Sequence, residues 1–215
     1  MIFETMDVAI PLYDGFTALD AVGPYEVLTR MPGANVSFVA EEPGPVRTET
    51  RALAMTADRA LDDLPAPDIL MVPGGLGTRR LLDGGPMVEW VRSAHETSQW
   101  TTSVCTGSLL LGAAGVLDGL EATTHWLELE TLERFGARPV QRRVVEEGKV
   151  MTAAGVSSGI DMALVLVARI AGDGIAQAIQ LGIEYDPDPP FPGGSPRTSP
   201  PHIVELVRSR ARELA

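Results

Sequence analysis

Cysteine and basic residues are both scarce in this sequence. Its 215 residues include one cysteine, Cys105, which cannot form a disulfide within the chain. A single cysteine favours a reducing compartment, and we expect a cytoplasmic protein. The 17 Lys and Arg residues are outnumbered by 29 Asp and Glu, for a formal net charge of −12 at pH 7. This charge repels phosphate backbones and anionic lipids, so neither nucleic acid nor a membrane is an expected partner.

Long apolar runs and cofactor motifs are also missing. No apolar run reaches the roughly 18 residues of a membrane span, and the amino-terminal stretch lacks the basic region and cleavage site of a secretory signal. The three histidines, His95, His125 and His202, are scattered without metal-ligand spacing. The stretch "PGGLGTRR" has Arg80 where a dinucleotide fingerprint needs its third glycine, and no "GxxxxGK" occurs. We therefore expect a small-molecule site without metal or nucleotide cofactor.

Short apolar runs alternate with helical patterns along the chain. Alternating strands and helices predict an α/β protein with a mostly parallel sheet and helices on both faces. A β-hairpin is expected over 44–61, and an antiparallel strand pair over 137–155. The remaining strands are expected over 7–13, 35–40, 68–75 and 100–104, and helices over 17–31, 86–98, directly after Cys105, and over 157–170.

One Pro-rich segment, 185–201, follows these elements and precedes a last helical pattern. It is too short to be a linker between domains, and no internal repeat is present. We expect a single domain over residues 1–215, with this segment as an ordered arm before a carboxy-terminal helix.

Cys105 lies between a β-branched run and a small-residue helical pattern in "TTSVCTGSLLLGAAG". A strand that turns sharply into a helix presents the residue at the turn, as in a nucleophile elbow. The helix N-terminus would stabilise a thiolate there and lower the thiol pKa. Free cysteines are also among the most buried residues and often only fill space. The two interpretations are a low-pKa nucleophile and an inert buried side chain.

A nucleophile needs anion stabilisation and a proton donor nearby. The glycines of "PGGLG" end a neighbouring strand, and the backbone around Gly75 and Leu76, with the N–H of Thr106, is a candidate oxyanion environment; a plain turn is the alternative. Asp20 stands among apolar residues where the first strand leads into its helix. Partial burial would raise its pKa and let it donate a proton, although aspartate in such a place is often a helix cap.

The histidines are weaker candidates. His125, in "ATTHW", follows a strand and could approach the site, although a structural hydrogen bond is an equally good interpretation. His95 and His202 are expected at the surface.

Four motifs together resemble a known family. "LDAVGPYEVL", "MVPGGLGT", "VCTGSLLLGAAGVLDGLEATTHW" and "LGIEYDPDPPFPGGSP" look like the ThiJ/PfpI superfamily, related to class I glutamine amidotransferases, and within it the isocyanide hydratases. The similarity covers nearly the whole chain, from Asp7 to the last helix. The cysteine turn and "PGG" are shared across the superfamily. The aspartate of "LDxxGP", the "CTGS" sequence and the "YDPxPPF" arm narrow the choice.

The resemblance implies a flavodoxin-like three-layer sandwich, a homodimer, and hydration of an isocyanide to an N-substituted formamide without a cofactor. It implies that Cys105 is the nucleophile, Asp20 the neighbouring carboxylic acid, Thr106 a hydrogen-bond donor and Gly75 part of the backbone around the sulfur. The thiolate would add to the terminal isocyanide carbon while Asp20 supplies a proton. Water would then release the formamide from the covalent thioimidate.

Differences between this sequence and other branches of the superfamily decide which other activities are expected. The peptidase-like branch has histidine directly after the nucleophile, where this chain has Thr106, so a Cys-His hydrolase is not expected. The branch with glyoxalase activity usually pairs its cysteine with glutamate in place of Asp20, which leaves methylglyoxal hydration as a weaker alternative. Sensor domains of AraC-type regulators share the aspartate and cysteine motifs but continue into a helix-turn-helix module. Because this chain stops at Ala215, a complete regulator is not expected, and a sensor fragment or a non-catalytic relative is the second alternative.

Overall fold

The computed structural model describes residues 4–213. By their internal contacts the described residues form two compact units, the first ending at Ile183 and the second beginning at Glu184. The prediction of one domain over 1–215 stays a prediction. No helix in the described range 4–213 is long and apolar enough to cross a membrane.

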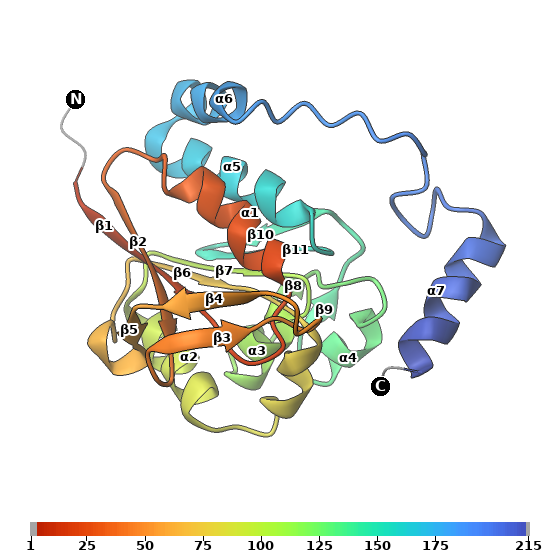
Figure 1. The fold of residues 1–215 in the computed structure, drawn as a ribbon, viewed down its shortest axis with the longest axis horizontal. Coiled ribbons are helices and arrows are strands. Elements are labelled where there is room, and N and C mark those ends of the chain that lie inside the picture. The colour runs from red at the N-terminus through yellow and green to blue at the C-terminus, as the bar shows by residue number, and fades with distance from the viewer. Residues whose placement is uncertain (1–3, 214–215) are drawn as a thin grey trace. The chain divides into compact units, whose positions relative to one another are not determined.

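The first unit is an alternation of strands and helices (Figure 1). Its strands are β1 (Met6–Pro11), β2 (Ala34–Ala40), β3 (Gly44–Arg47), β4 (Ala54–Ala57), β5 (Arg59–Ala60), β6 (Ile69–Val72), β7 (Trp100–Val104), β8 (Glu121–Ala122), β9 (Arg138–Pro139), β10 (Val144–Glu147) and β11 (Val150–Ala153). Its helices are α1 (Ala18–Leu28), α2 (Pro86–Thr97), α3 (Gly107–Ala113), α4 (Leu129–Glu133), α5 (Ser158–Ala171) and α6 (Asp173–Gly182), with 3₁₀ turns η1 (Leu61–Asp63) and η2 (Leu76–Arg80).

Seven of the described strands form one sheet in the order β10-β11-β7-β6-β1-β2-β5. Every pairing in it is parallel except β10 with β11, which is antiparallel. The hairpin of β3 and β4 and the short pair of β8 and β9 are separate. The predicted mostly parallel sheet, hairpin and antiparallel strand pair are confirmed.

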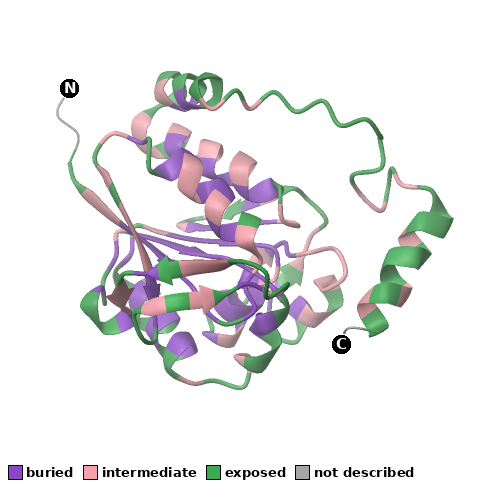
Figure 2. Cartoon of the chain, viewed as in Figure 1, coloured by how far each residue is buried: buried purple, intermediate pink, exposed green. Residues whose placement is uncertain are grey.

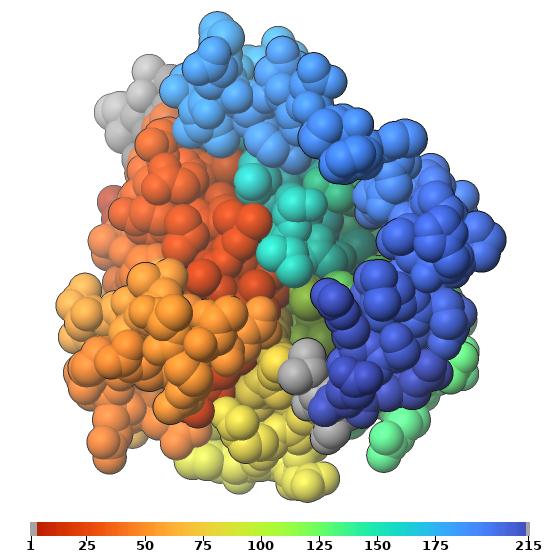
Figure 3. Space-filling view, turned by 45° about the vertical axis from the view of Figure 1, so that its right-hand side comes forward, coloured from red at the N-terminus to blue at the C-terminus, as the bar shows by residue number. Residues whose placement is uncertain are grey.

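Helices cover both faces of the sheet. α1 packs against α5 on one face, and α2 packs against α3 on the other. Figure 3 shows α1 and α5 side by side at the surface, in orange-red and cyan. The result is the predicted three-layer α/β sandwich, and the central strands lie in its middle layer.

The core is the sheet and the inner faces of these helices, shown in purple in Figure 2. All four residues of β6 are buried, as are the last four of β1 and of β7. Strands covered on both faces carry continuous apolar or β-branched runs, which is the pattern that the sequence shows at these positions.

The helices α4 and α6 and the position of His95 differ from expectation. α6 was not predicted, because Gly172 and Gly174 bracket its start and its ten residues are few for a clear helical period. His95 is half-buried, and its Nδ1 lies 2.8 Å from Thr101 Oγ1, so the expected surface position is wrong for this histidine. His202 is exposed, as expected.

The second unit contains the Pro-rich segment and α7 (Pro201–Glu213). Its hydrogen bonds include short-range ones: the N–H groups of Thr198 and Ser199 both donate to the carbonyl of Ser195. None of the described residues of α7 is buried, and Ile203, Leu206 and Val207 are among its exposed apolar side chains.

Candidate active site

Cys105 occupies the turn between β7 and α3. Its φ is +56°, a left-handed conformation that non-glycine residues rarely adopt. Backbone contacts hold it there, because its N–H donates to the Ala154 carbonyl at 2.8 Å and its own carbonyl accepts from Thr124 Oγ1 at 2.9 Å. A third contact comes from Ser108 Oγ, 3.1 Å from the same carbonyl. The sharp strand–turn–helix conformation is the predicted elbow.

Glycine is required beside the elbow because the neighbouring strand approaches closely. A Cβ on Gly107 would lie 2.2 Å from the carbonyl oxygen of Val72, at the end of β6. A Cβ on Gly74 would lie 2.5 Å from the Thr106 nitrogen and 2.9 Å from Asp20 Oδ2. The two turns therefore pack backbone against backbone, with Asp20 between α1 and this contact.

Asp20 is fully buried on the first turn of α1. Its Oδ2 accepts the Gly74 N–H at 3.0 Å, while its Oδ1 is buried without a hydrogen bond of ordinary geometry in the described part of the chain. Burial raises the pKa of this carboxyl from its ordinary 3.8 to about 7; the Gly74 N–H lowers the pKa, the Glu49 charge raises it, and the Cys105 thiol lowers it by hydrogen bonding. Asp20 can therefore hold a proton beside the sulfur near neutral pH.

Thr106 is tied to the turn after β6 rather than left free. The Gly75 N–H donates to Thr106 Oγ1 at 2.8 Å, and that hydroxyl lies 3.1 Å from the Gly75 carbonyl, to which it donates. The amide of Gly75 is already used in this arrangement, so its predicted contribution as a free oxyanion donor is not present. Gly74 and Gly75 instead use consecutive N–H groups to hold Asp20 and Thr106.

The environment of the sulfur differs from the expected one. Burial raises the pKa of the Cys105 thiol far above its usual range, and the Asp20 charge raises it further. The N–H groups of Thr106 and Val156 and the Thr106 side chain, all close to the sulfur, lower the pKa but do not offset burial. The expected lowering of this pKa by the helix end is therefore outweighed by desolvation.

Three groups at the site were missed from sequence. Val156 supplies a backbone N–H, which no side-chain pattern reveals. Tyr13 is buried, and its hydroxyl donates to the Pro73 carbonyl at 2.7 Å, directly before Gly74. Burial raises the pKa of Tyr13, and the charges of Asp20, Cys105 and Glu49 raise it further. Glu49 comes from the hairpin loop, far in sequence from the other residues.

Leu76 and His125 lie at the edge of this group. The Leu76 N–H donates to Glu49 Oε2 at 3.3 Å, and its side chain is exposed. Nδ1 of His125 accepts the Leu127 N–H at 3.4 Å, and its ring packs on Gly155. Burial lowers the pKa of His125, while the charges of Glu128 and Glu49 raise it. These contacts fit the structural interpretation of His125.

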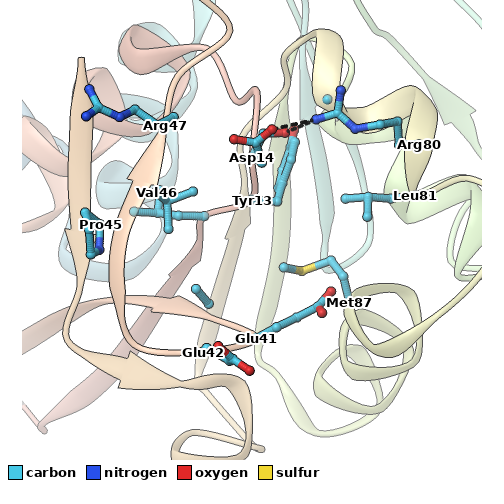
Figure 4. Close-up of a pocket in the computed structure, with 13 residues that line it drawn as sticks. Tyr13, Asp14, Glu41, Glu42, Pro45, Val46, Arg47, Arg80, Leu81 and Met87 are labelled. Carbon is cyan, nitrogen blue, oxygen red and sulfur yellow. Dashed lines mark hydrogen bonds and ion pairs between the residues drawn. The ribbon is translucent and has the colours of Figure 1, made fainter. Parts of the chain in front are cut away.

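A cavity of about 460 Å³ also involves Tyr13 (Figure 4). Its wall carries apolar side chains such as Leu81 and Met87, and the Asp14–Arg80 ion pair stands at one side. Neither Cys105 nor Asp20 lines it. Within residues 4–213 no cluster of His, Cys, Asp and Glu could hold a metal ion.

Similarity to known proteins agrees with this geometry. Residues 6–169 match the DJ-1/PfpI family. The chain belongs to that family. It is 40% identical over 206 residues to the isonitrile hydratase of Pseudomonas putida, covering 96% of this chain and 90% of that protein. A ThiJ/PfpI family protein from Pseudomonas syringae has the same fold, with a TM-score of 0.95 and 34% identity over 99% of this chain and 88% of that one.

A transcriptional regulator is a more distant relative. The HTH-type transcriptional regulator CdhR of Pseudomonas aeruginosa is 30% identical over 175 residues, or 77% of this chain, which spans 51% of that protein. The resemblance to the ThiJ/PfpI superfamily and the α/β fold it implied are confirmed. The roles of individual residues stay predictions.

Proposed function

We propose that this DJ-1/PfpI family member hydrates isocyanides to N-substituted formamides, with Cys105 as nucleophile and Asp20 as proton carrier. The observation that carries the proposal is the buried pair itself: Asp20 is fully buried beside the Cys105 thiol and keeps one carboxyl oxygen without a hydrogen-bond partner among the described residues. The near full-length similarity to an isonitrile hydratase supports the choice of substrate. Thr106 and Val156 are proposed to orient and stabilise the sulfur.

The first step adds the thiol across the terminal isocyanide carbon. The sulfur forms the C–S bond, its proton moves to the Asp20 carboxylate, and Asp20 delivers that proton to the same carbon. The product is a thioimidate, R–N=CH–S–Cys105, which contains every atom of the isocyanide and the thiol. Asp20 ends the step as a carboxylate, ready to accept another proton.

The second step consumes water. The oxygen of a water molecule attacks the thioimidate carbon while the Asp20 carboxylate takes a proton from that water. Asp20 then passes the proton to the nitrogen. The tetrahedral adduct then breaks its C–S bond, the hydroxyl proton returns to sulfur, and R–NH–CHO leaves. No electrons are transferred to or from an outside partner, and no group other than water is consumed.

The assembly and location are part of the same proposal. We infer a homodimer in the cytoplasm, supported by the family resemblance and by the lone cysteine. Its partner is a small-molecule isocyanide rather than nucleic acid, since the net charge of −12 disfavours polyanions.

The test is formamide formation from phenyl isocyanide by the wild-type protein, Cys105→Ala and Cys105→Ser. We expect turnover in the wild type and loss of at least about a thousandfold in both variants, because a serine hydroxyl is a far weaker nucleophile than a thiolate. Circular dichroism and thermal melting check that both variants fold. Unchanged turnover in Cys105→Ala would rule out the nucleophile.

A glyoxalase-like activity and a ligand-binding role are the alternatives to isocyanide hydration. If the folded wild type turns over no isocyanide, formation of lactate from methylglyoxal is measured next, and a ligand-binding role gains support from the similarity to the regulator CdhR. Either result would overturn the proposed hydratase.

A further inference from the structure

Glu49 is fixed against the two segments that build the site. Its backbone N–H donates to the Phe16 carbonyl at 3.0 Å, just before α1 and Asp20. Its Oε2 accepts the Leu76 N–H at 3.3 Å, directly after Gly75. These two contacts hold the side chain of a hairpin residue between the start of α1 and the turn after β6.

The carboxylate of Glu49 is half-buried and lacks a cationic neighbour. None of the ion pairs among residues 4–213 includes Glu49, and the nearby Arg51 and Arg80 both pair with Asp14. Its negative charge reaches three groups of the site, since it raises the pKa values of Asp20, Tyr13 and His125. A half-buried charge without a counterion is screened less by solvent than a fully exposed one, so it can act on a ligand bound nearby.

Apolar side chains stand next to these same segments. Leu19 precedes Asp20, Leu76 follows Gly75, and Leu53 lies in the loop of Glu49, where its carbonyl accepts the Thr48 N–H. All three side chains are more than 40% exposed, at 43%, 41% and 48%. The segments that carry Asp20, Gly75 and Glu49 thus each expose an apolar side chain, and Glu49 adds one negative charge.

We propose that Glu49 is a specificity-determining residue that favours isocyanides with an apolar substituent carrying a positive charge and disfavours substituents carrying a carboxylate. The inference rests on the proposed hydratase function and names its substrate class. An ammonium group on the substituent would supply the counterion that Glu49 lacks, whereas a carboxylate would be repelled by Glu49.

The first experiment compares three aryl isocyanides: the unsubstituted phenyl compound, its para-aminomethyl derivative and its para-carboxylate. For the wild type we expect kcat/KM to be highest for the cationic compound, with a cation-to-anion ratio of at least about tenfold, as expected for one charge at moderate effective dielectric. Glu49→Gln keeps the size of the side chain and an oxygen for the Leu76 N–H. We expect it to reduce that ratio severalfold while the phenyl compound is still turned over.

The control variant is Glu96→Gln, which makes the same change in net charge. Glu96 is exposed on the last turn of α2, shortly before β7 begins, whereas Cys105 directly follows the other end of β7. We expect its cation-to-anion ratio to match that of the wild type. An equal ratio in wild type and Glu49→Gln would overturn the inference, as would an equal drop in Glu96→Gln.

A second measurement separates this inference from the proposed function. Because the chain has one cysteine, mass spectrometry of alkylated protein reports on Cys105 alone. We expect iodoacetate to react more slowly relative to iodoacetamide than it does with free cysteine, and Glu49→Gln to bring the ratio severalfold closer to the free value. If isocyanides are not turned over but this ratio responds, only the hydratase assignment fails. If the ratio is the same in both proteins, the role of Glu49 is overturned.

Discussion

Asp20 and Cys105 titrate as a coupled pair, because the charge of each one changes the pKa of the other. The pKa of Asp20 is raised to about 7, mainly by burial, and that of Cys105 is raised further by burial and by the Asp20 charge. The pair therefore loses its first proton near neutral pH and its second only in strong alkali. With one proton left, the pair can exist as thiol and carboxylate or as thiolate and carboxylic acid, and both forms belong to the proposed reaction.

We predict that kcat/KM for isocyanide hydration rises as pH increases through about 7 and then stays level over the next two units. Below pH 7 the pair holds two protons, and neither a thiolate nor a carboxylate is available. A pH–rate profile with phenyl isocyanide checks this. A profile that falls through pH 7 would instead mean that the doubly protonated pair is the active form.

Burial of Asp20 should also make the free energy of unfolding depend on pH. Below about pH 4 this carboxyl is protonated in both folded and unfolded chains; between about 4 and 7 only the unfolded chain releases the proton, so the free energy of unfolding falls as pH rises. The full loss above pH 7 is on the order of 4 kcal/mol, given about 1.4 kcal/mol per pKa unit. Asp20→Asn carries no charge and should lose activity yet gain stability relative to wild type between pH 5 and 8.

Urea unfolding of both proteins at pH 5 and pH 8 measures this difference. Asp83→Asn is the control, because Asp83 is exposed in a turn and its removal should leave the pH dependence unchanged. A stability difference between wild type and Asp20→Asn that does not grow from pH 5 to pH 8 would contradict the assignment.

At the scale of elements, the turn after β6 organises the site. Tyr13, two residues after β1, donates to the Pro73 carbonyl, and the N–H groups of Gly74 and Gly75 donate to Asp20 and Thr106. Three parallel strands thus meet at their carboxyl ends, where ligands bind in open α/β sheets. The close approach of this turn to the cysteine elbow leaves no room for a side chain at Gly74.

We predict that Gly74→Ala destabilises the protein by about 2 kcal/mol or more and lowers activity, since the new methyl group would overlap backbone and displace Asp20. The matched control is Gly174→Ala in α6, where nothing lies within 4 Å of the new Cβ. That change should stabilise by up to about 1 kcal/mol, because alanine favours a helix more than glycine does. Thermal melting measures both changes in stability: we expect a lower melting temperature for Gly74→Ala and a higher one for Gly174→Ala. Equal melting temperatures for the two variants would contradict the packing argument.

At the scale of the whole molecule, assembly is the property to measure. We predict a homodimer, as the family resemblance implies, and the second unit carries exposed apolar residues that include Phe191 and Leu206. Sedimentation velocity at micromolar concentration should give twice the chain mass of 22.9 kDa. A monomer at that concentration would reject the prediction.

The sequence by itself determined the alternation of strands and helices and the elbow at Cys105, because these follow from local patterns that depend on near neighbours in the chain. The pairing of that cysteine with Asp20 was implied only by the family resemblance, since the two residues lie far apart in the sequence. Glu49, Tyr13 and the Val156 amide were decided only by the tertiary structure, because a hairpin loop, a strand end and a backbone N–H reach the site through folding. The direction of the Cys105 pKa shift also depended on the fold, since desolvation is set by what surrounds the sulfur from every side.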